Sequence, residues 1–448
     1  MKITQYSTNA FRRFGASELR PALPMPELIT AAPAKEPIAS SFLGFGVALT
    51  GSSCYLLNAM EPDRRRELLD SVYSDRGLAL SVGRLTVASS DYSAELYSYD
   101  DVKEDRELRH FSVERDRAYI LPMLRQILAV RPLSLFASPW SPPGWMKTGG
   151  SMCGGFMREE YLDCYADYLV RYLLAYREEG IPIFALTPQN EPLNSQFGRM
   201  PACIWHPDTE ARFVLLLRKK LRENGLSPEI WINDHAFNEA IPRVLWQLGE
   251  YPELSSACEG AAFHYYAGSV EQTAILRERY PRLALHFTEG GPRLQDHYGT
   301  DWCKWAIMII KALEAGYSSF TGWNLLLDET GGPNVGPFTC GGLVTLDSRT
   351  GELSYSGQYH AFRHFSPYIR PGARIYPLDF ANNLSYRMFS YPKQEKRVEG
   401  CFVRNADGEE ALFLVNPNET KRQISFLHRD TPWYIELLPD TVATVLFR

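Results

Sequence analysis

Short runs of apolar and β-branched residues alternate along this chain with longer segments in which apolar residues recur every three or four positions. The short runs are typical of buried strands. The longer segments have the period of amphipathic helices, as over residues 159–177 and 209–223. Eight strands are predicted from the short runs, at residues 41–50, 81–90, 132–140, 182–190, 229–235, 260–266, 282–289 and 318–326.

Eight successive βα units indicate an α/β fold, a (β/α)8 TIM barrel in which a covering helix follows each parallel strand. After residue 368 short alternating segments separated by turn signals predict an attached antiparallel β-sandwich domain. We expect residues 1–37 to add a strand or two to it. The predicted domains are therefore the catalytic barrel at 38–368 and a side domain of 1–37 with 369–448. The predicted side-domain strands are 383–390, 400–404, 410–416, 423–427 and 433–447.

The composition is that of an ordinary globular protein with ample material for one large core. Of the 448 residues, 45% are hydrophobic and 22% are charged, with a net charge of -6. Basic residues are not clustered, so neither nucleic acid nor an anionic membrane surface is an expected partner. Aromatic residues make up 13% of the chain, and such rings commonly stack on the apolar faces of sugars.

The N-terminal segment has no apolar stretch of the length that a secretory signal needs, and no later window approaches a membrane-spanning helix. We therefore expect a cytoplasmic protein without membrane insertion. The eight cysteines are scattered without CxxC spacing, which indicates free thiols rather than a zinc site or a disulfide framework. The oligomeric state is left open by these patterns.

Two predicted barrel strands end in a carboxylate: the fourth at Glu191 and the seventh at Glu289. In a βα-barrel the active site forms at the C-terminal strand ends, so both carboxylates face one mouth. Glycosidic bond cleavage needs such a pair, and a gap of about 5 Å across a narrow mouth implies retention of the anomeric configuration. We expect a raised pKa at Glu191 as the acid and an ionised Glu289 as the nucleophile. Asn190, beside the acid, is placed to hydrogen-bond a sugar hydroxyl.

Short motifs form an ordered set through nearly the whole chain. They are GFG at 44–46, GR at 83–84, ASSDYS at 88–93, YSYD at 97–100, ASPWSPPGWMK at 137–147, NEP at 190–192, HYY at 264–266, TE at 288–289, GWN at 322–324, GGPN at 331–334, YH at 359–360 and HFS at 364–366. The set resembles glycoside hydrolase family 30, which contains acid β-glucosidase (glucosylceramidase), bacterial β-glucosidases, β-xylosidases and β-1,6-glucanases. The resemblance implies a βα-barrel with a β-sandwich formed from both chain termini, in agreement with the strand pattern.

The resemblance also implies roles for particular residues, without a metal or other cofactor. Glu191 matches the family acid/base and Glu289 the nucleophile. Arg84 matches the arginine that supports the nucleophile's carboxylate, a task that suits its planar fork of donors. Other matching positions hold or wall the sugar in the terminal subsite, or lie beside the nucleophile: Asp91, Trp140, Trp323, Asn324, His264 and Tyr266.

The sequence departs from relatives at the walls of this site. Gly51 stands where many relatives have Asp, Tyr265 stands where glucosylceramidase has Trp, and residues 290–291 are Gly-Gly where that enzyme has bulkier residues. These differences disfavour a ceramide-type leaving group. The loops at 151–159 and 328–342 are expected to set the leaving-group preference.

The pattern favours a retaining exo-acting β-glycosidase, best matched by a β-glucosidase, with a carbohydrate or glycoside as its partner. The same mechanism on β-1,6-glucan, β-xyloside or β-fucoside stays open, as does an inverting hydrolase. An alternative from another class is a carbohydrate-binding barrel without catalysis. Metal-dependent hydrolysis by His235, His264 and His286 is disfavoured, because His286 and Glu289 are expected on opposite faces of one strand.

Overall fold

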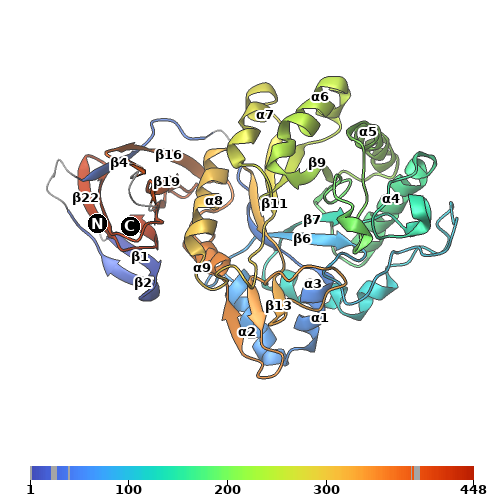
Figure 1. Cartoon of the computed structure of the whole chain (residues 1–448), viewed down its shortest axis with the longest axis horizontal. Helices are drawn as coiled ribbons and strands as arrows, with labels where there is room; N and C mark the ends of the chain where they lie inside the picture. Colours follow the sequence, from blue (N-terminus) through green and yellow to red (C-terminus); the bar gives the residue numbers. More distant parts are fainter. Residues whose placement is uncertain (1–2, 22–27, 39–40, 385, 388–393, 448) are drawn as a thin grey trace.

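A computed structural model of the protein describes residues 3–21, 28–38, 41–384, 386–387 and 394–447. Figure 1 shows a barrel surrounded by helices beside a smaller β-sheet domain that contains both chain termini. Eight parallel strands close the barrel in the order β10-β11-β12-β5-β6-β7-β8-β9, which confirms the fold class and the eight predicted strands. Their bounds are β5 Gly44–Ala48, β6 Val82–Val87, β7 Ser134–Pro139, β8 Ala185–Leu186, β9 Glu229–Ala236, β10 Gly260–His264, β11 Ala284–Glu289 and β12 Ser319–Gly322.

Strand β8 covers only two residues of the predicted 182–190, because prolines on both sides lack the N–H that a strand ladder needs. The main chain nevertheless stays beside β7. The N–H groups of Thr187 and Asn190 donate to carbonyls of that strand at 3.0 and 2.8 Å. Glu191 therefore reaches the barrel mouth at a fixed position.

Helices cover the outside of the barrel (Figure 1). The predicted helix at 159–177 is a 3-10 turn followed by α4, and the one at 209–223 is α5, so both predictions are confirmed. The α-helices are α1 Gly51–Ala59, α2 Pro62–Tyr73, α3 Ile120–Val130, α4 Leu162–Glu178, α5 Pro207–Glu223, α6 Trp246–Glu250, α7 Ala274–Arg279, α8 Trp302–Glu314 and α9 Gly357–Phe365. Shorter 3-10 or π segments are η1 Glu114–Ala118, η2 Gly144–Met146, η3 Thr148–Gly150, η4 Glu159–Tyr161, η5 Gln196–Gly198, η6 Phe237–Ala240, η7 Ile241–Leu245, η8 Pro252–Ser256 and η9 Val270–Thr273.

The side domain is one ten-stranded, mostly antiparallel sheet in the order β2-β1-β23-β20-β19-β16-β4-β21-β22-β3. The sheet folds over on itself like a sandwich. The ring centroid of Phe426 on β21 therefore lies 6.0 Å from that of Phe402 on β19 and 5.7 Å from that of Phe447 on β23. The bounds are β1 Ile3–Asn9, β2 Arg12–Glu18, β3 Arg20–Pro21, β4 Ile29–Pro33, β16 Arg374–Ala381, β19 Glu399–Arg404, β20 Glu410–Asn416, β21 Arg422–His428, β22 Thr431–Leu437 and β23 Thr441–Phe447.

Several side-domain predictions differ from the structure. The N-terminal segment supplies four strands rather than one or two, and β16 was not predicted. The predicted strand at 433–447 is two strands, because Pro439 and the left-handed Asp440 (φ 46°) form a turn. Of the predicted 383–390, β17 Tyr386–Arg387 pairs with β18 Gln394–Glu395, while 385 and 388–390 lie outside the described residues. A small sheet of β13 Leu326–Asp328, β14 Val344–Leu346 and β15 Leu353–Tyr355 was also not predicted.

The side domain packs against helices α8 and α9 of the barrel. His364 of α9 accounts for part of this contact: its two ring nitrogens lie 2.9 and 2.8 Å from the hydroxyls of Thr444 and Thr8. Phe365 stacks on Phe413, with ring centroids 4.7 Å apart. Both ends of the chain are thereby fixed to the barrel. The domain boundaries at 37/38 and 368/369 stay a prediction.

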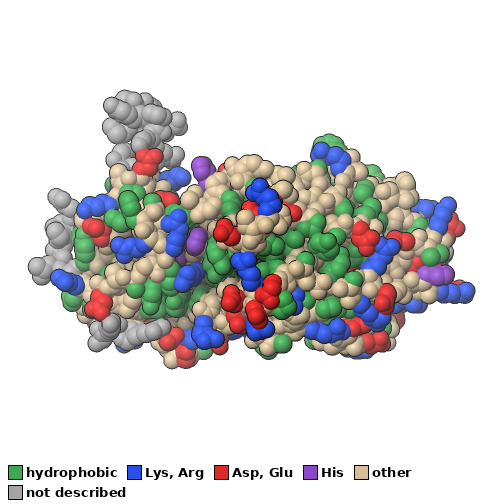
Figure 2. Space-filling view, turned by 90° about the horizontal axis from the view of Figure 1, so that it is seen from below, with side chains coloured by type: hydrophobic (Ala, Val, Ile, Leu, Met, Phe, Trp, Pro, Cys, Tyr) green, Lys and Arg blue, Asp and Glu red, His purple; other side chains and the backbone are tan. Residues whose placement is uncertain are grey.

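The surface and the cysteines agree with an ordinary globular protein. On the face drawn in Figure 2, basic and acidic side chains are interspersed among hydrophobic and neutral ones. All eight cysteines are free thiols, as predicted, and only Cys153 and Cys340 are not fully buried. Among the described residues, none of the helices is both long and apolar enough to cross a bilayer.

Candidate active site

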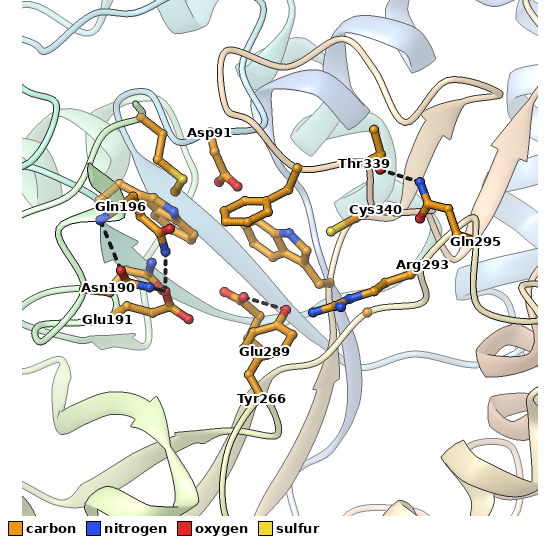
Figure 3. Close-up of a pocket in the computed structure, with 16 residues that line it drawn as sticks. Asp91, Asn190, Glu191, Gln196, Tyr266, Glu289, Arg293, Gln295, Thr339 and Cys340 are labelled. Atoms are coloured by element: carbon orange, nitrogen blue, oxygen red, sulfur yellow. Dashed lines mark hydrogen bonds between the residues drawn. The ribbon is translucent and has the colours of Figure 1, made fainter. Parts of the chain in front are cut away.

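The C-terminal ends of the barrel strands surround a cavity of about 360 Å³, a size typical of small-ligand pockets (Figure 3). The opposite half of the barrel interior is filled by packed side chains around Trp231. Chemistry is therefore confined to one end of the barrel. Of the residues predicted for the site, those lining the cavity are Asp91, Trp140, Asn190, Glu191, Tyr266, Glu289 and Trp323, whereas Arg84, His264 and Asn324 lie behind its walls.

Glu191 stands where the chain leaves β8, in a left-handed conformation with φ of 47°. A non-glycine residue in that conformation costs about 1–3 kcal/mol, and such strain clusters at functional sites. The side-chain amides of Asn194 and Gln196 donate to Glu191 Oε2 at 3.1 and 3.2 Å, and Nδ1 of His264 lies 3.3 Å from Oε1. Three donors thus fix the carboxylate in one orientation at the mouth.

Glu289 ends β11 at the floor of the cavity and is largely buried, with 5% of its surface exposed. The Tyr266 hydroxyl donates to its Oε1 at 2.9 Å, and the Arg84 guanidinium forms an ion pair with its Oε2. Arg84 is itself buried beside a stacked pair of indole rings, with its guanidinium carbon 4.9 Å from the Trp140 centroid and 5.4 Å from that of Trp323. The packing fixes the plane of the guanidinium and therefore the direction of the Glu289 carboxylate.

The two carboxylates face each other across the cavity, as Figure 3 shows. One oxygen of Glu191, one oxygen of Glu289 and a ring nitrogen of His264 all lie within 4.8 Å of one another. Carboxyl groups about 5–5.5 Å apart leave room for a sugar carbon but not for an intervening water, whereas about 6.5–9.5 Å is needed for inversion.

Asp234 was not predicted for the site, yet it organises the buried charges. Its carboxylate accepts hydrogen bonds from Arg84 Nη2 at 2.8 Å and His264 Nε2 at 3.0 Å. Hydroxyls of Ser138, Thr187 and Thr288 donate to the same carboxylate at 2.8, 2.9 and 2.7 Å.

The backbone brings Asp234 into the barrel through an irregularity in β9. Asn233 and Asp234 have φ of 78° and 42°, and the pairing of β9 with β10 shifts register there. A bulge re-aims a side chain in this way. The available signal in the sequence was a carboxylate inside an otherwise apolar strand, Ile230-Trp-Ile-Asn-Asp.

His264 carries a proton in this network. Burial opposes its charged form, but the negative charge of Glu289 and the hydrogen bonds to Asp234 and Glu191 raise the pKa of His264 to about 9. Burial alone would also raise the pKa of Glu191, yet the hydrogen bond and charge of His264 lower it to about 2. The prediction of a raised pKa at Glu191 is therefore wrong. Burial raises the pKa of Glu289, and the charges of His264 and Arg84 offset only part of this.

Aromatic and polar walls surround the space between the carboxylates. Trp140 and Trp323 stack with centroids 5.2 Å apart, and both line the cavity. Asp91 lies on the same side; its Oδ1 has no hydrogen-bond partner among the described residues, so it is free to accept from a ligand hydroxyl. Asn190 lines the cavity too, with its Oδ1 accepting from Arg84 at 2.8 Å.

Asn324 does not wall the cavity as predicted. Its side chain is fully buried, and its Oδ1 accepts a hydrogen bond from the Thr50 hydroxyl at 2.9 Å. Asn324 has φ of 49°, which turns the chain sharply after β12 and directs the amide toward the start of α1. Asn324 therefore links the ends of β12 and β5 behind the wall of the cavity.

Glycines 290 and 291 allow this wall to approach the nucleophile strand. A Cβ on Gly291 would lie 2.8 Å from Cβ of Trp323, and one on Gly290 would lie 2.8 Å from the Phe287 ring. The backbone N–H of Trp323 donates to the Gly290 carbonyl at 3.0 Å. Bulkier residues at these two positions would push the indole away from the cavity.

The three histidines considered for a metal do not converge. His286 stacks on Trp231 with centroids 3.6 Å apart, and burial lowers its pKa to about 3, whereas the ring of His235 lies 6.5 Å from that of His264. Glu191, His264 and Glu289 do form a compact group. However, both nitrogens of His264 face carboxylates, and its proton occupies the lone pair that a metal requires. This donor set does not fit a metal.

Comparison with known proteins places the chain. The family model described as glycosyl hydrolase family 30 TIM-barrel domain matches residues 42–369. A putative glucosylceramidase 3 of Caenorhabditis elegans is 31% identical over 431 residues, which cover 91% of this chain and 80% of that protein. An endo-1,6-beta-D-glucanase of Neurospora crassa is 31% identical over 349 residues, covering 74% and 71%.

A solved structure, SrfJ from Salmonella typhimurium, superposes with a TM-score of 0.91 at 28% identity and covers 100% of both chains. The family model spans well over half of this chain, and the fold and motifs agree with it. The chain therefore belongs to glycosyl hydrolase family 30 and is a glycoside hydrolase.

Proposed function

We propose that the protein hydrolyses β-glucosidic bonds with retention, through a covalent glycosyl-enzyme intermediate. The observation that carries this proposal is the approach of the Glu191 and Glu289 carboxylate oxygens within 4.8 Å across one cavity. That separation supports direct attack by a carboxylate rather than by an intervening water. Asp91 and the stacked indoles line one part of the cavity as a wall, which supports exo action on a terminal sugar.

In the first step Glu289 attacks the anomeric carbon and forms an ester with the sugar. Tyr266 and Arg84 hold its carboxylate while the bond forms. Glu191 donates a proton to the departing oxygen. The proton that His264 holds lies on Nδ1, 3.3 Å from Glu191 Oε1, so it can pass to that carboxylate when a glycoside fills the cavity. Asp234 keeps the histidine ring in place through Nε2.

In the second step Glu191 removes a proton from water, which attacks the same anomeric carbon and releases Glu289. Two inversions give net retention. No metal takes part, and every proton transfer stays among side chains of this chain and water.

A matched set of variants tests the mechanism. Glu191→Gln and Glu289→Gln keep the size of each side chain but remove its acid chemistry, and we expect each to lose more than about 1000-fold in turnover of an aryl β-glucoside. Glu314→Gln, on the far end of α8, changes a partly buried glutamate outside the site and serves as the control. Full activity in either site variant contradicts the assignment.

Stereochemistry gives an independent test. Proton NMR of the first product anomer should show the β form, and Glu289→Gly with azide should yield the α-glycosyl azide. A first product of inverted configuration would refute the double displacement. Turnover of an aryl β-glucoside, β-xyloside and β-fucoside, measured side by side, identifies which sugar the enzyme prefers.

A second candidate substrate is β-1,6-glucan. It is favoured by the Neurospora crassa relative, whose name describes an endo-1,6-beta-D-glucanase. Release of oligosaccharides of several lengths from the polymer would support endo action. Release of single glucose units would support the exo proposal.

A further inference from the structure

The mouth of the cavity has two preformed walls outside the catalytic pair. One wall is the turn after Glu191, and the other is a ribbon formed by the segments after β11 and β12 (Figure 3). A glycosidic leaving group bonded to a sugar between Glu191 and Glu289 has to pass between them. Their side chains therefore determine which leaving group fits.

The turn after Glu191 is held against the carboxylate. The side chain of Gln196 is almost buried, with 8% of the residue exposed, and its amide donates to Glu191 Oε2. Gln196 and Phe197 both have φ of 51°, so two successive non-glycine residues are left-handed. This turn directs the Gln196 amide inward, whereas the Phe197 ring does not line the cavity; it is 88% exposed, with the Arg199 guanidinium carbon 5.6 Å from its centroid.

The opposite wall is a short ribbon with its own hydrogen bonds. Arg293 pairs with Cys340 as an antiparallel bridge, and the Gln295 amide donates to the Thr339 hydroxyl at 2.5 Å. Arg293, Gln295 and the half-exposed Phe338 line the cavity. Figure 3 shows the Arg293 guanidinium pointing from this ribbon into the cavity. In the part of the chain that the structure describes, no carboxylate forms an ion pair with it.

The geometry points to a leaving-group subsite for a second, neutral sugar ring, held by Arg293 and Gln295 against the phenyl ring of Phe338. This inference rests on the proposed glycosidase function and deepens it. A sugar ring presents hydroxyls to a planar guanidinium and an amide, and an apolar face to an exposed aromatic ring.

Two other leaving groups fit these walls less well. A lipid chain would cover the donors of Arg293 and Gln295 without offering acceptors, and each buried unpaired polar group weakens binding about 5- to 150-fold. An anionic group would attract the Arg293 guanidinium, but it would also meet Glu191 and Glu289 across the same cavity, where like charges repel. A neutral sugar satisfies the donors and avoids the repulsion.

Three substrates and three proteins test the inference. The substrates are an aryl β-glucoside, a β-1,6-linked glucose disaccharide and octyl β-glucoside. The proteins are the wild type, Arg293→Met and the control Arg109→Met, whose arginine is 71% exposed away from the cavity. We expect Arg293→Met to lower kcat/KM for the disaccharide by at least about 10-fold, the effect of losing hydrogen bonds to a charged group. The value for octyl β-glucoside should not fall, because the variant removes a donor that an alkyl chain leaves unpaired, and this retained cleavage also shows that the variant is folded. The aryl glucoside should lose less than the disaccharide, because an aryl group offers no hydroxyl to the guanidinium.

A second pair of variants tests the aromatic contribution. Phe338→Ala should lower kcat/KM for the disaccharide selectively by about 5-fold, while Phe11→Ala, at an 82% exposed phenylalanine of the side domain, should not.

The outcomes separate the two proposals. No cleavage of any β-glycoside by the wild type would end the proposed function and this inference with it. Cleavage of the aryl glucoside with an equal loss on all three substrates in Arg293→Met would overturn only the inference, because the residue would then act on the shape of the site. A loss largest on octyl β-glucoside would also overturn it, in favour of a lipid leaving group.

Discussion

Asp234→Asn provides the most direct test of the buried charge network. The substitution keeps the shape of the side chain but removes its charge, and it turns one acceptor into a donor that faces Arg84 or His264. Breaking a buried ion pair by removing one partner costs about 3–5 kcal/mol of unfolding free energy. We expect a loss of that size near pH 6, measured by urea unfolding followed through tryptophan fluorescence.

The pH dependence of stability identifies which interaction is lost. The pKa of His264 rises from 6.5 to about 9 on folding, so its contribution is fully present below pH 6.5 and is lost as the pH rises through 9. A pKa shift of this size corresponds to about 3 kcal/mol of unfolding free energy. Without the Asp234 charge, the same interval should account for only about 1–2 kcal/mol, because a hydrogen bond between charged groups contributes about 1.5–3 kcal/mol.

The control for this experiment is Asp116→Asn. Asp116 is a buried carboxylate that accepts from the hydroxyls of Tyr97, Tyr99 and Tyr176 at 2.6 Å each, and these donors carry no positive charge. The control should be destabilised with a pH dependence like that of the wild type, which also cancels the titration of all other groups. If Asp234→Asn retains the full wild-type decrease between pH 6.5 and 9, Asp234 does not hold the His264 proton and the reasoning is refuted.

Three further substitutions test two contacts of the site and one buried charge that does not line the cavity. Tyr266→Phe removes a hydrogen bond to the Glu289 carboxylate, so kcat/KM should fall about 10- to 100-fold and the acid limb of the pH profile should move to higher pH. Gly291→Ala places a Cβ 2.8 Å from Cβ of Trp323, so the displaced indole should raise KM and lower kcat/KM about 10-fold in steady-state assays. Lys147→Met removes a buried ammonium that donates to Ser141 and to two backbone carbonyls, which should lower the unfolding free energy by about 2–4 kcal/mol in urea titrations.

Each of these has a matched control. Gly249→Ala adds a methyl group where nothing lies within 4 Å, and Lys219→Met changes an ammonium that is 71% exposed. Tyr434→Phe alters a hydroxyl near a carboxylate of the side domain, far from the cavity. Wild-type kinetics in Tyr266→Phe or Gly291→Ala, or wild-type stability in Lys147→Met, would contradict the corresponding contact.

The barrel was predictable because its strands are buried on both faces and read as continuous apolar runs between polar helices. The side domain was harder. Strand β16 contains a proline and an aspartate within Arg374–Ala381, and it pairs first with β19 and then with β4, so its pattern matches neither partner throughout. Two strands merged into one prediction at 433–447, because a Pro-Asp turn was missed.

The site was predictable where a residue ends a strand and not where it depends on backbone irregularity. Glu191 and Glu289 stand at strand ends, which the periodicity locates. Asp234 faces the cavity network only because two successive left-handed residues interrupt β9, and simple alternation gives no sign of this. Asn324 is the opposite case, a residue predicted for the site that lies outside the cavity. Its position after β12 suggested a wall residue, yet a left-handed turn directs its amide to Thr50.

The low pKa of Glu191 and its proposed role as an acid are reconciled by the charge balance of the site. Arg84 and His264 carry two positive charges, while Asp234, Glu191 and Glu289 carry three negative charges when ionised. A sugar in the cavity expels water, which strengthens these interactions and increases the cost of the excess negative charge. A proton then moves from His264 to Glu191, which removes two buried charges. Glu289 is tied to Arg84, whereas Glu191 is held by neutral amides and by a histidine that can release its proton, so this proton resides on Glu191 when the substrate is in place.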